Sequence, residues 1–297
     1  MAVVKNRVVV PELLRVIENL NDDFLTPIRS MDDKVNNETI NFNEIGADPD
    51  VLIDNTSYPI ATAGRTDDSK VVALKKLETE NTKVTDDEIY ALGYDKKSSV
   101  MQRHAIALKK EQLRLAAWSL TPASDAANTP VIKTTGTAVS NLKALLPADL
   151  IALKAKADLL EIPLDARYLV LCSKHANDLL AVDQSFRDRY YNTQTGKVIA
   201  NILGFQIYES VYCPKFVGTT DAKKAYGAAA AASDANASFF YSNINAMKAK
   251  GSTKMYLSNA EENPENRESV LGFRQYFIVS PVQTKAIGAI IDHYTGA

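Results

Sequence analysis

Three histidines, two cysteines and several pairs of carboxylates are the residues of this chain whose chemistry could serve catalysis or metal binding. The histidines, His104, His175 and His293, form no H-x-x-x-H or H-E-x-x-H pair, so the sequence predicts no zinc site. We expect His104 to be packed or hydrogen-bonded on a helix. The cysteines, Cys172 and Cys213, lie in apolar or strand-like runs without C-x-x-C spacing, and we expect them to be small buried thiols.

The acidic residues give no clearer signal of catalysis. Pairs at 22–23, 32–33, 67–68, 86–87 and 261–262 lie in expected loops or helix starts, where carboxylates are solvated or favour the helix dipole. An enzyme that uses two of them stays an alternative, because the sequence prefers no pair. The chain has no G-x-G-x-x-G, Walker A or G-x-S-x-G motif. The sequence therefore predicts no catalytic, cofactor-binding or metal-binding residue, and no cofactor.

Length and composition limit the class of protein. The chain has 297 residues, of which 46% are hydrophobic and 24% are charged, as in ordinary globular proteins. Its net charge of −2 argues against direct nucleic-acid binding as the main task. We expect no signal peptide, and no apolar run approaches the length that spans a bilayer. These features predict a protein that is made and kept in a reducing cytoplasm, or in something assembled there.

The first 84 residues predict extended elements rather than a compact body. Leu13, Leu14, Ile17 and Leu20 have the spacing of one short amphipathic helix, followed by a polar stretch typical of an extended arm. From Glu38 to Val84 the pattern indicates a β-hairpin with a polar tip. We expect its strand-like segments at 39–42, 51–53 and 70–74, with a turn at 64–68.

The next segment predicts two helices and a long loop. Thr85 to Glu88 is a capping box that should start a short helix ending near Leu92. A longer helix should run from Asp95 to Trp118, with Lys109, Lys110 and Arg114 largely off its apolar stripe of Val100, Met101, Ala105, Leu108 and Leu115. Residues 121–141 are small and polar, and we expect a loop crossing between two subdomains.

The second half predicts a mixed α and β body. Pro147 should open a helix whose buried face is Leu150, Leu153, Ala157 and Leu160, and Pro163 bars its extension. A buried strand at 168–172 should lead into a helix that Ser173 caps, with Leu179 and Val182 on its apolar face. We expect a strand pair around Gly204, a surface insertion or short helix at 228–232 and a charged turn at 259–267. Further strands are expected at 238–241, 254–257 and 270–279, before an apolar closing segment at 281–291.

The 13 tyrosines fit either a core or a contact surface. Buried tyrosine is the ordinary case, but the side chain also suits protein–protein interfaces, because its ring buries apolar area while its hydroxyl finds a partner. An extended arm, a projecting hairpin and a compact body suit a protein whose function is contact with copies of itself.

Several local segments, taken in order, carry a resemblance to a known family. A helix, a link and a strand run from Ala148–Lys154 through Pro163 to Tyr168–Ser173, and Gly196–Pro214 forms a hairpin-like segment. A strand at 237–247 and a late strand within 262–279, which contains Glu265-Asn266-Arg267, follow. In this order and spacing the chain resembles, over almost its whole length, the tailed-bacteriophage major capsid proteins of the Hong Kong 97 type.

The resemblance implies an α+β capsid fold in five segments. An N-terminal arm (1–37) precedes an extended β-hairpin called the E-loop (38–84). A peripheral domain with a long spine helix (85–141) and an axial domain with a central sheet flanked by helices (142–266) follow. The last segment (267–297) is a return strand to the peripheral domain and the C-terminal segment. The polar tract 192–197 then becomes a candidate for the loops that meet near a capsomer axis.

The implied function is structural rather than enzymatic. Copies would self-assemble as pentamers and hexamers into an icosahedral shell around a double-stranded DNA genome, in a virion assembled in the bacterial cytoplasm. The implied partners are the chain itself, a portal protein, a separate scaffolding protein, decoration proteins and, non-specifically, the packaged DNA at the inner face; no membrane is implied. Two alternatives stay open. One is an encapsulin-type compartment shell that encloses a cargo enzyme, and the other is a cytosolic α/β enzyme with an unsignatured carboxylate site.

Two departures from the family limit what the resemblance implies. Some members begin with a long helical scaffolding segment, whereas here the arm starts almost at Met1, so we expect scaffolding to be separate, absent or already cleaved from a longer precursor. Some members form lysine–asparagine crosslinks assisted by a glutamate in the late strand, but Val270–Tyr276 contains no acid. Although Lys70, Lys75 and Lys76 lie in the hairpin, we predict no autocatalytic crosslink.

Overall fold

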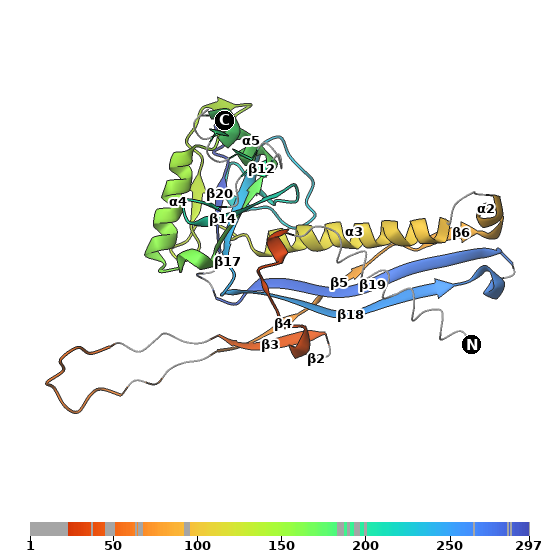
Figure 1. The fold of residues 1–297 in the computed structure, drawn as a ribbon, viewed down its shortest axis with the longest axis horizontal. Coiled ribbons are helices and arrows are strands. Elements are labelled where there is room, and N and C mark those ends of the chain that lie inside the picture. The colour runs from red at the N-terminus through yellow and green to blue at the C-terminus, as the bar shows by residue number, and fades with distance from the viewer. Residues whose placement is uncertain are drawn as a thin grey trace.

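The computed structural model describes residues 23–36, 38–44, 51–62, 64, 68–91, 96–182, 187–188, 191–192, 197–198, 201–263, 265–283, 285 and 287–296. Two sheets organise these residues. A five-stranded sheet runs beside the long helix α3 (Lys96–Ser119), and an eight-stranded sheet carries the helices α4 (Pro147–Leu159) and α5 (Ser173–Val182) (Figure 1). No helix among these residues is long and apolar enough to cross a membrane.

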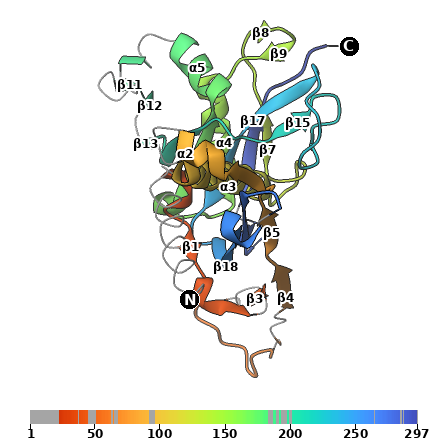
Figure 2. The same cartoon turned by 90° about the vertical axis from the view of Figure 1, so that its right-hand side faces the viewer.

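The five-stranded sheet is built mainly from two long antiparallel strands. They are β18 (Ala246–Ser258) and β19 (Glu268–Pro281), and β1 (Arg29–Ser30) pairs with the outer side of β18. On the far side of β19 lie β5 (Lys75–Glu78) and β6 (Thr82–Thr85). Figure 2 shows β1 and β5 at opposite sides of this sheet, with α3 above it.

The long helix α3 packs on one face of this sheet, as its apolar stripe predicts. Ala105 and Leu108 are buried in a cluster with Leu271 and Phe273 of β19. Lys109 was expected to lie off this stripe. That expectation is wrong, because Lys109 is buried and only 5% exposed. The preceding short helix α2 (Asp86–Ala91) has the predicted capping box, in which the Thr85 amide donates to Glu88 at 3.2 Å.

The predicted hairpin is present, and it extends away from both sheets (Figure 1). Strands β3 (Thr39–Glu44) and β4 (Asp68–Ala73) pair antiparallel, and β2 (Val35–Asn36) pairs with β3. The expected strand at 51–53 is wrong, since no strand partner reaches these residues in the described part of the hairpin. Of the expected turn at 64–68, residues 65–67 lie outside the described residues. The helix expected around Leu13 to Leu20 also lies outside them.

The eight-stranded sheet has the order β13-β14-β10-β17-β15-β16, with β20 beside β17 and β7 beside β20. Its central strand β10 (Arg167–Cys172) is buried at every position and is parallel to β14 (Phe205–Ser210) and antiparallel to β17 (Asp234–Ser242). The predicted strand pair is formed by β13 (Asn201–Ile202) and β14, which are joined through Leu203 and Gly204, both with positive φ. The remaining strands are β15 (Lys215–Val217), β16 (Ala222–Lys223), β20 (Ile287–Ile291) and β7 (Val131–Lys133).

The two faces of this sheet have separate cores. On one face, α4 and α5 contribute Leu150, Leu153 and Leu179 to a cluster with Leu169 and Phe240. The other face carries aromatic side chains of β10 and β17, and it is covered by residues 24–28 and the C-terminal end of α3. This second core joins the two sheets into one body.

Three further expectations differ from the structure. The expected loop 121–141 contains β7, which pairs parallel with β20, and β8 (Ala138–Val139), which pairs with β9 (Leu142–Lys143). These strands are too short for a period-two pattern to reveal. Ser173 is the first residue of α5 rather than its cap, and Val182 is exposed because the helix ends there. Short elements complete the chain: β11 (Tyr191–Asn192), β12 (Lys197–Val198) and the 3-10 turns Asp23–Leu25, Asp32–Lys34, Leu164–Ala166 and Ala260–Glu262.

The sheets divide the chain differently from the five predicted segments. Residues 75–84, expected in the hairpin, and β18, expected in the axial segment, both belong to the sheet beside α3. The last strand β20 lies in the eight-stranded sheet. The cause is long-range pairing, which sequence order does not reveal. The bounds of the functional domains stay a prediction.

Candidate functional site

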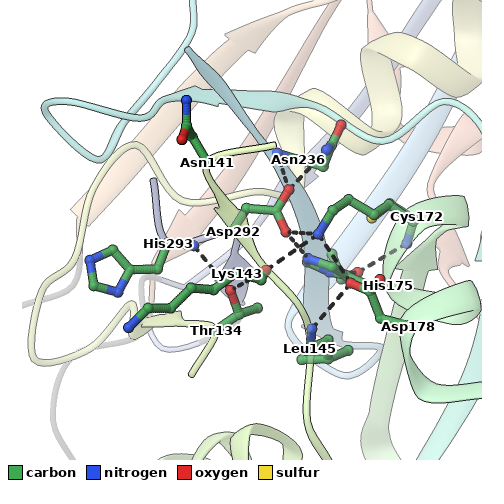
Figure 3. Close-up of polar contacts among 12 residues, drawn as sticks. Thr134, Asn141, Lys143, Leu145, Cys172, His175, Asp178, Asn236, Asp292 and His293 are labelled. Atoms are coloured by element: carbon green, nitrogen blue, oxygen red, sulfur yellow. Dashed lines mark hydrogen bonds and ion pairs between the residues drawn. The ribbon is translucent and has the colours of Figure 1, made fainter. Parts of the chain in front are cut away.

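A buried polar network lies where the C-terminal end of β20 meets α5 and β17 (Figure 3). At its centre is Asp292, whose side chain is fully buried. Its Oδ1 accepts from Lys174 Nζ at 2.7 Å and lies 3.1 Å from His175 Nε2. Its Oδ2 accepts from the backbone N and the Nδ2 of Asn236 at 3.0 and 2.8 Å. One carboxylate therefore binds three neighbouring side chains and one backbone amide.

The network continues to the loop before α4. Lys174 Nζ also donates to Asp178 Oδ2 at 3.0 Å, and the same oxygen accepts from the Leu145 backbone amide at 3.1 Å. On the other side, His175 Nδ1 lies 2.7 Å from Ser238 Oγ, which accepts from the Cys172 amide at 2.9 Å. The network thus connects β10, β17, β20, α5 and the loop before α4, and holds the eight-stranded sheet to its helices.

Ser238, His175 and Asp292 have the composition of a Ser-His-Asp triad, but they do not fit catalysis. A nucleophilic serine must contact its substrate, and in a triad it lies at an open site. Here all three side chains are 0% exposed. The geometry instead satisfies buried polar groups, which would be costly to leave unpaired.

Burial and neighbouring charges change the pKa values inside the network. Burial alone lowers the pKa of His175, but charge interactions and hydrogen bonds with Cys172 and Asp292 outweigh it and raise this pKa to about 9. Burial alone raises the pKa of Asp292, but the bonds from His175, Lys174 and Asn236 outweigh it, and the pKa is lowered. The network therefore favours a charged carboxylate at its centre.

The lowered pKa of Asp292 predicts that this residue accounts for part of the stability that the protein loses in acid. Because the folded pKa lies below the unfolded value of 3.8, the carboxylate stabilises the fold above pH 3.8, and this share is lost as pH falls through the folded pKa. We expect the difference in unfolding free energy between wild type and Asp292→Asn to shrink below about pH 4. Urea unfolding of both proteins at several pH values measures it. A difference that stays constant from pH 7 to the acid transition would contradict the assignment.

The residues that the sequence singled out lie in separate places. His104 is 7% exposed on α3, and its Nε2 lies 3.0 Å from Thr82 Oγ1, as expected for a packed, hydrogen-bonded histidine. Cys172 is a free buried thiol, as expected, and Cys213 is free and half-buried. His293 lies at the edge of the network, where its amide donates to Thr134 at 3.0 Å. Among the described residues, no group of three or more histidine, cysteine or acidic side chains is placed to hold a metal ion.

Sequence reasoning missed the buried network because no local motif encodes it. His175 is 63 positions from Ser238 and 117 from Asp292. The pairing of β17 with both β10 and β20 brings these positions together. The only local signal is that a polar residue follows the apolar run Ile287–Ile291.

The hairpin tip, residues 51–62, is the second candidate site. In the described structure it lies far from both sheets (Figure 1). Its large apolar side chains face solvent: Val51 and Ile53 are 85% exposed, and Leu52, Tyr58 and Ile60 are 53–75% exposed. Several large apolar side chains exposed within one short segment indicate a contact site for another molecule. The tip therefore has the character of an interface without its partner.

Comparison with solved structures shows that the fold of this chain is similar to that of capsid proteins. The chain is similar to the capsid of the cyanophage P-SCSP1u, with 15% identity over 91% of this chain and 88% of that chain and a TM-score of 0.65. It is similar to a structure of Mycobacterium phage Che8, with 12% identity over 91% of each chain and a TM-score of 0.65. It is also similar to a virus-like particle from Pyrococcus furiosus, with 12% identity over 95% and 97% and a TM-score of 0.54.

No protein-family model and no curated protein matches the sequence. The likeness to capsid structures therefore rests on the fold, and at these identities it shows the fold alone. It confirms the α+β capsid fold of the Hong Kong 97 type that the sequence predicts.

Proposed function

We propose that this chain is the major capsid protein of a tailed bacteriophage, whose copies assemble as pentamers and hexamers into an icosahedral shell around double-stranded DNA. The observation that carries the proposal is the exposed apolar hairpin tip on a fold that matches phage capsids along 91% of the chain. In an assembled shell the tip overlaps a neighbouring copy, and its apolar side chains leave water.

The physical basis of assembly is repetition. Each subunit contributes the same hairpin and receives one from a neighbour, so a contact of modest area is repeated around the shell. Such contacts stabilise by shared buried area and mass action. A head-to-tail contact that closes on itself gives a finite particle. Catalysis has no part in this role.

The two alternatives are less well supported. The chain is similar to several phage and gene transfer agent capsids, at TM-scores of 0.61–0.65, and this likeness supports a genome shell over a cargo compartment. A carboxylate enzyme would need convergent acids in an open pocket. The most enzyme-like constellation in the described part of the chain is instead sealed around Asp292. Portal, scaffolding and decoration proteins and the packaged DNA are the partners that a genome shell requires.

Light scattering and electron microscopy of the purified chain, alone and with a scaffolding protein, test the proposal. We expect closed particles of uniform size. Monomers under every assembly condition would count against a shell. Neighbouring portal and terminase genes support a phage, and a neighbouring cargo oxidase or ferritin-like gene supports a compartment.

The shell is expected to lack covalent crosslinks between subunits. The segment Val270–Tyr276 of β19 has no acidic residue, and the one acid of this strand, Glu268, is its first residue and pairs with Lys83 at 3.4 Å. We therefore expect assembled particles to dissociate into single chains on a denaturing gel. A ladder of covalent multimers would refute this prediction.

A further inference from the structure

The two free cysteines lie near the same end of two neighbouring strands in the eight-stranded sheet. In the register of β10 and β14, Cys172 pairs with Ser210, and neighbouring strands lie about 5 Å apart. Cys213 follows Ser210 by three positions, and its Sγ donates to the Ser210 carbonyl oxygen at 3.4 Å. The chain after β14 therefore brings the Cys213 thiol back to the residue that Cys172 pairs with.

Cys172 has the surroundings of a reactive thiolate. It directly precedes Ser173, the first residue of α5, and so occupies the N-cap position, where a side chain can accept from the free amides of the first turn. The backbone amide and the side chain of His175 both bond to its sulfur, at the edge of the network drawn in Figure 3. Burial alone raises the pKa of Cys172, but the charge and the hydrogen bonds of His175 outweigh it, and the pKa is lowered.

Cys213 has complementary properties. Burial and, after it, the charge of Cys172 raise its pKa, so the Cys213 thiol stays protonated at neutral pH. The same interaction places the two sulfur atoms within reach of each other's charge. Cys213 also lines a hollow of about 460 Å³ between the C-terminal part of α3 and residues 211–234, together with Trp118, Tyr212 and Tyr226. A small oxidant can enter this hollow and reach the thiols.

We propose that Cys172 and Cys213 form a redox site, in which peroxide converts the two thiols into a disulfide that ties the end of β10 to the segment after β14. A reactive cysteine beside a second cysteine that resolves its oxidised form is the usual arrangement of such a site. Cys172 reacts first, and Cys213 resolves. The inference does not depend on the proposed shell, because both thiols belong to one subunit.

The reaction balances in two steps. The Cys172 thiolate attacks hydrogen peroxide, so that an S–O bond forms, the O–O bond breaks, and the hydroxide leaves as water with the proton of the His175 imidazolium. The Cys213 thiol then attacks the sulfenic acid on Cys172. An S–S bond forms, the S–O bond breaks, and the second hydroxide leaves as water with the proton of the Cys213 thiol. One peroxide is reduced to two waters, and two cysteines are oxidised to one disulfide.

The disulfide should stabilise the fold. It closes a loop that contains the 40 residues between Cys172 and Cys213, and such a loop restricts the unfolded chain. We therefore expect the oxidised subunit to unfold at a higher urea concentration than the reduced one. Reduction with dithiothreitol should return the midpoint to its first value.

Mass spectrometry of the peroxide-treated subunit, digested without reductant, tests the proposal. We expect a peptide pair that joins Cys172 to Cys213 within one chain, formed faster in the folded subunit than in the urea-unfolded one. In Cys213→Ser the reaction should stop at the sulfenic acid, and dimedone should label Cys172. In Cys172→Ser, which keeps a capping hydroxyl, dimedone should leave Cys213 unlabelled.

Each of the other outcomes overturns the inference. A folded subunit that forms no linked pair, or that forms it no faster than the unfolded chain, would show that the fold does not bring the thiols together. Disulfides that join only different chains would show the same. Dimedone labelling of Cys213 in Cys172→Ser, without labelling of Cys172 in Cys213→Ser, would contradict the assigned order of reaction. None of these results bears on shell assembly, which light scattering tests separately.

Discussion

Replacing Val51 and Ile53 by aspartate is expected to abolish shell assembly while leaving the subunit folded. Both side chains are 85% exposed in the subunit, so the substitutions remove little packing against the described residues. If both are buried against a neighbour, each contributes about 2 kcal/mol per contact. Losing about 4 kcal/mol raises the protein concentration needed for assembly by about a thousandfold. Light scattering over a concentration series measures that threshold.

The conservative pair Val51→Ile/Ile53→Val is the matched control for this experiment. It keeps the apolar area of the tip and should assemble like the wild type. Circular dichroism should give one unfolding midpoint for all three proteins, because the tip lies away from both cores. Assembly of the aspartate variant at the wild-type concentration would show that the tip does not enter an interface.

Asp292→Asn is expected to lower the free energy of unfolding by about 3–5 kcal/mol, the usual effect of breaking a buried charged network. The substitution keeps the shape of the side chain but removes its charge. It also turns one acceptor into a donor, which would face the donors of Asn236 or of Lys174 and His175. Urea unfolding of the unassembled subunit at pH 7 measures the loss.

Asp221→Asn provides the control for this second prediction. Its carboxylate pairs with Lys133 at 2.6 Å, but both side chains are partly exposed to water. A pair of this kind contributes at most about 1 kcal/mol. Equal losses from the two variants would show that burial of the Asp292 network does not contribute specifically to stability.

The sequence predicts two kinds of element well: those whose hydrophobic pattern repeats over several turns, and those that a capping residue or a proline delimits. The apolar stripe of α3, the capping box at Thr85 and the prolines around α4 each act within a few turns, so their signals are visible along the chain. β7 escapes prediction because its three residues have no period of their own and depend on β20, more than 150 positions later.

The candidate sites also differ in how far local sequence patterns predict them. The projecting hairpin follows from two alternating segments, but the exposure of Val51 and Ile53 is known only once the other described residues are placed. The Asp292 network is a product of long-range strand pairing. Local patterns predict helices and strands, whereas these sites depend on which helices and strands become neighbours in the fold.

A cryo-electron microscopy reconstruction of the particles formed by this chain is the most direct test of the account. We predict a closed icosahedral shell in which residues 51–60 of each subunit are buried against a neighbouring copy. Particles in which this segment faces solvent, or a protein that stays monomeric under every assembly condition, would contradict the account.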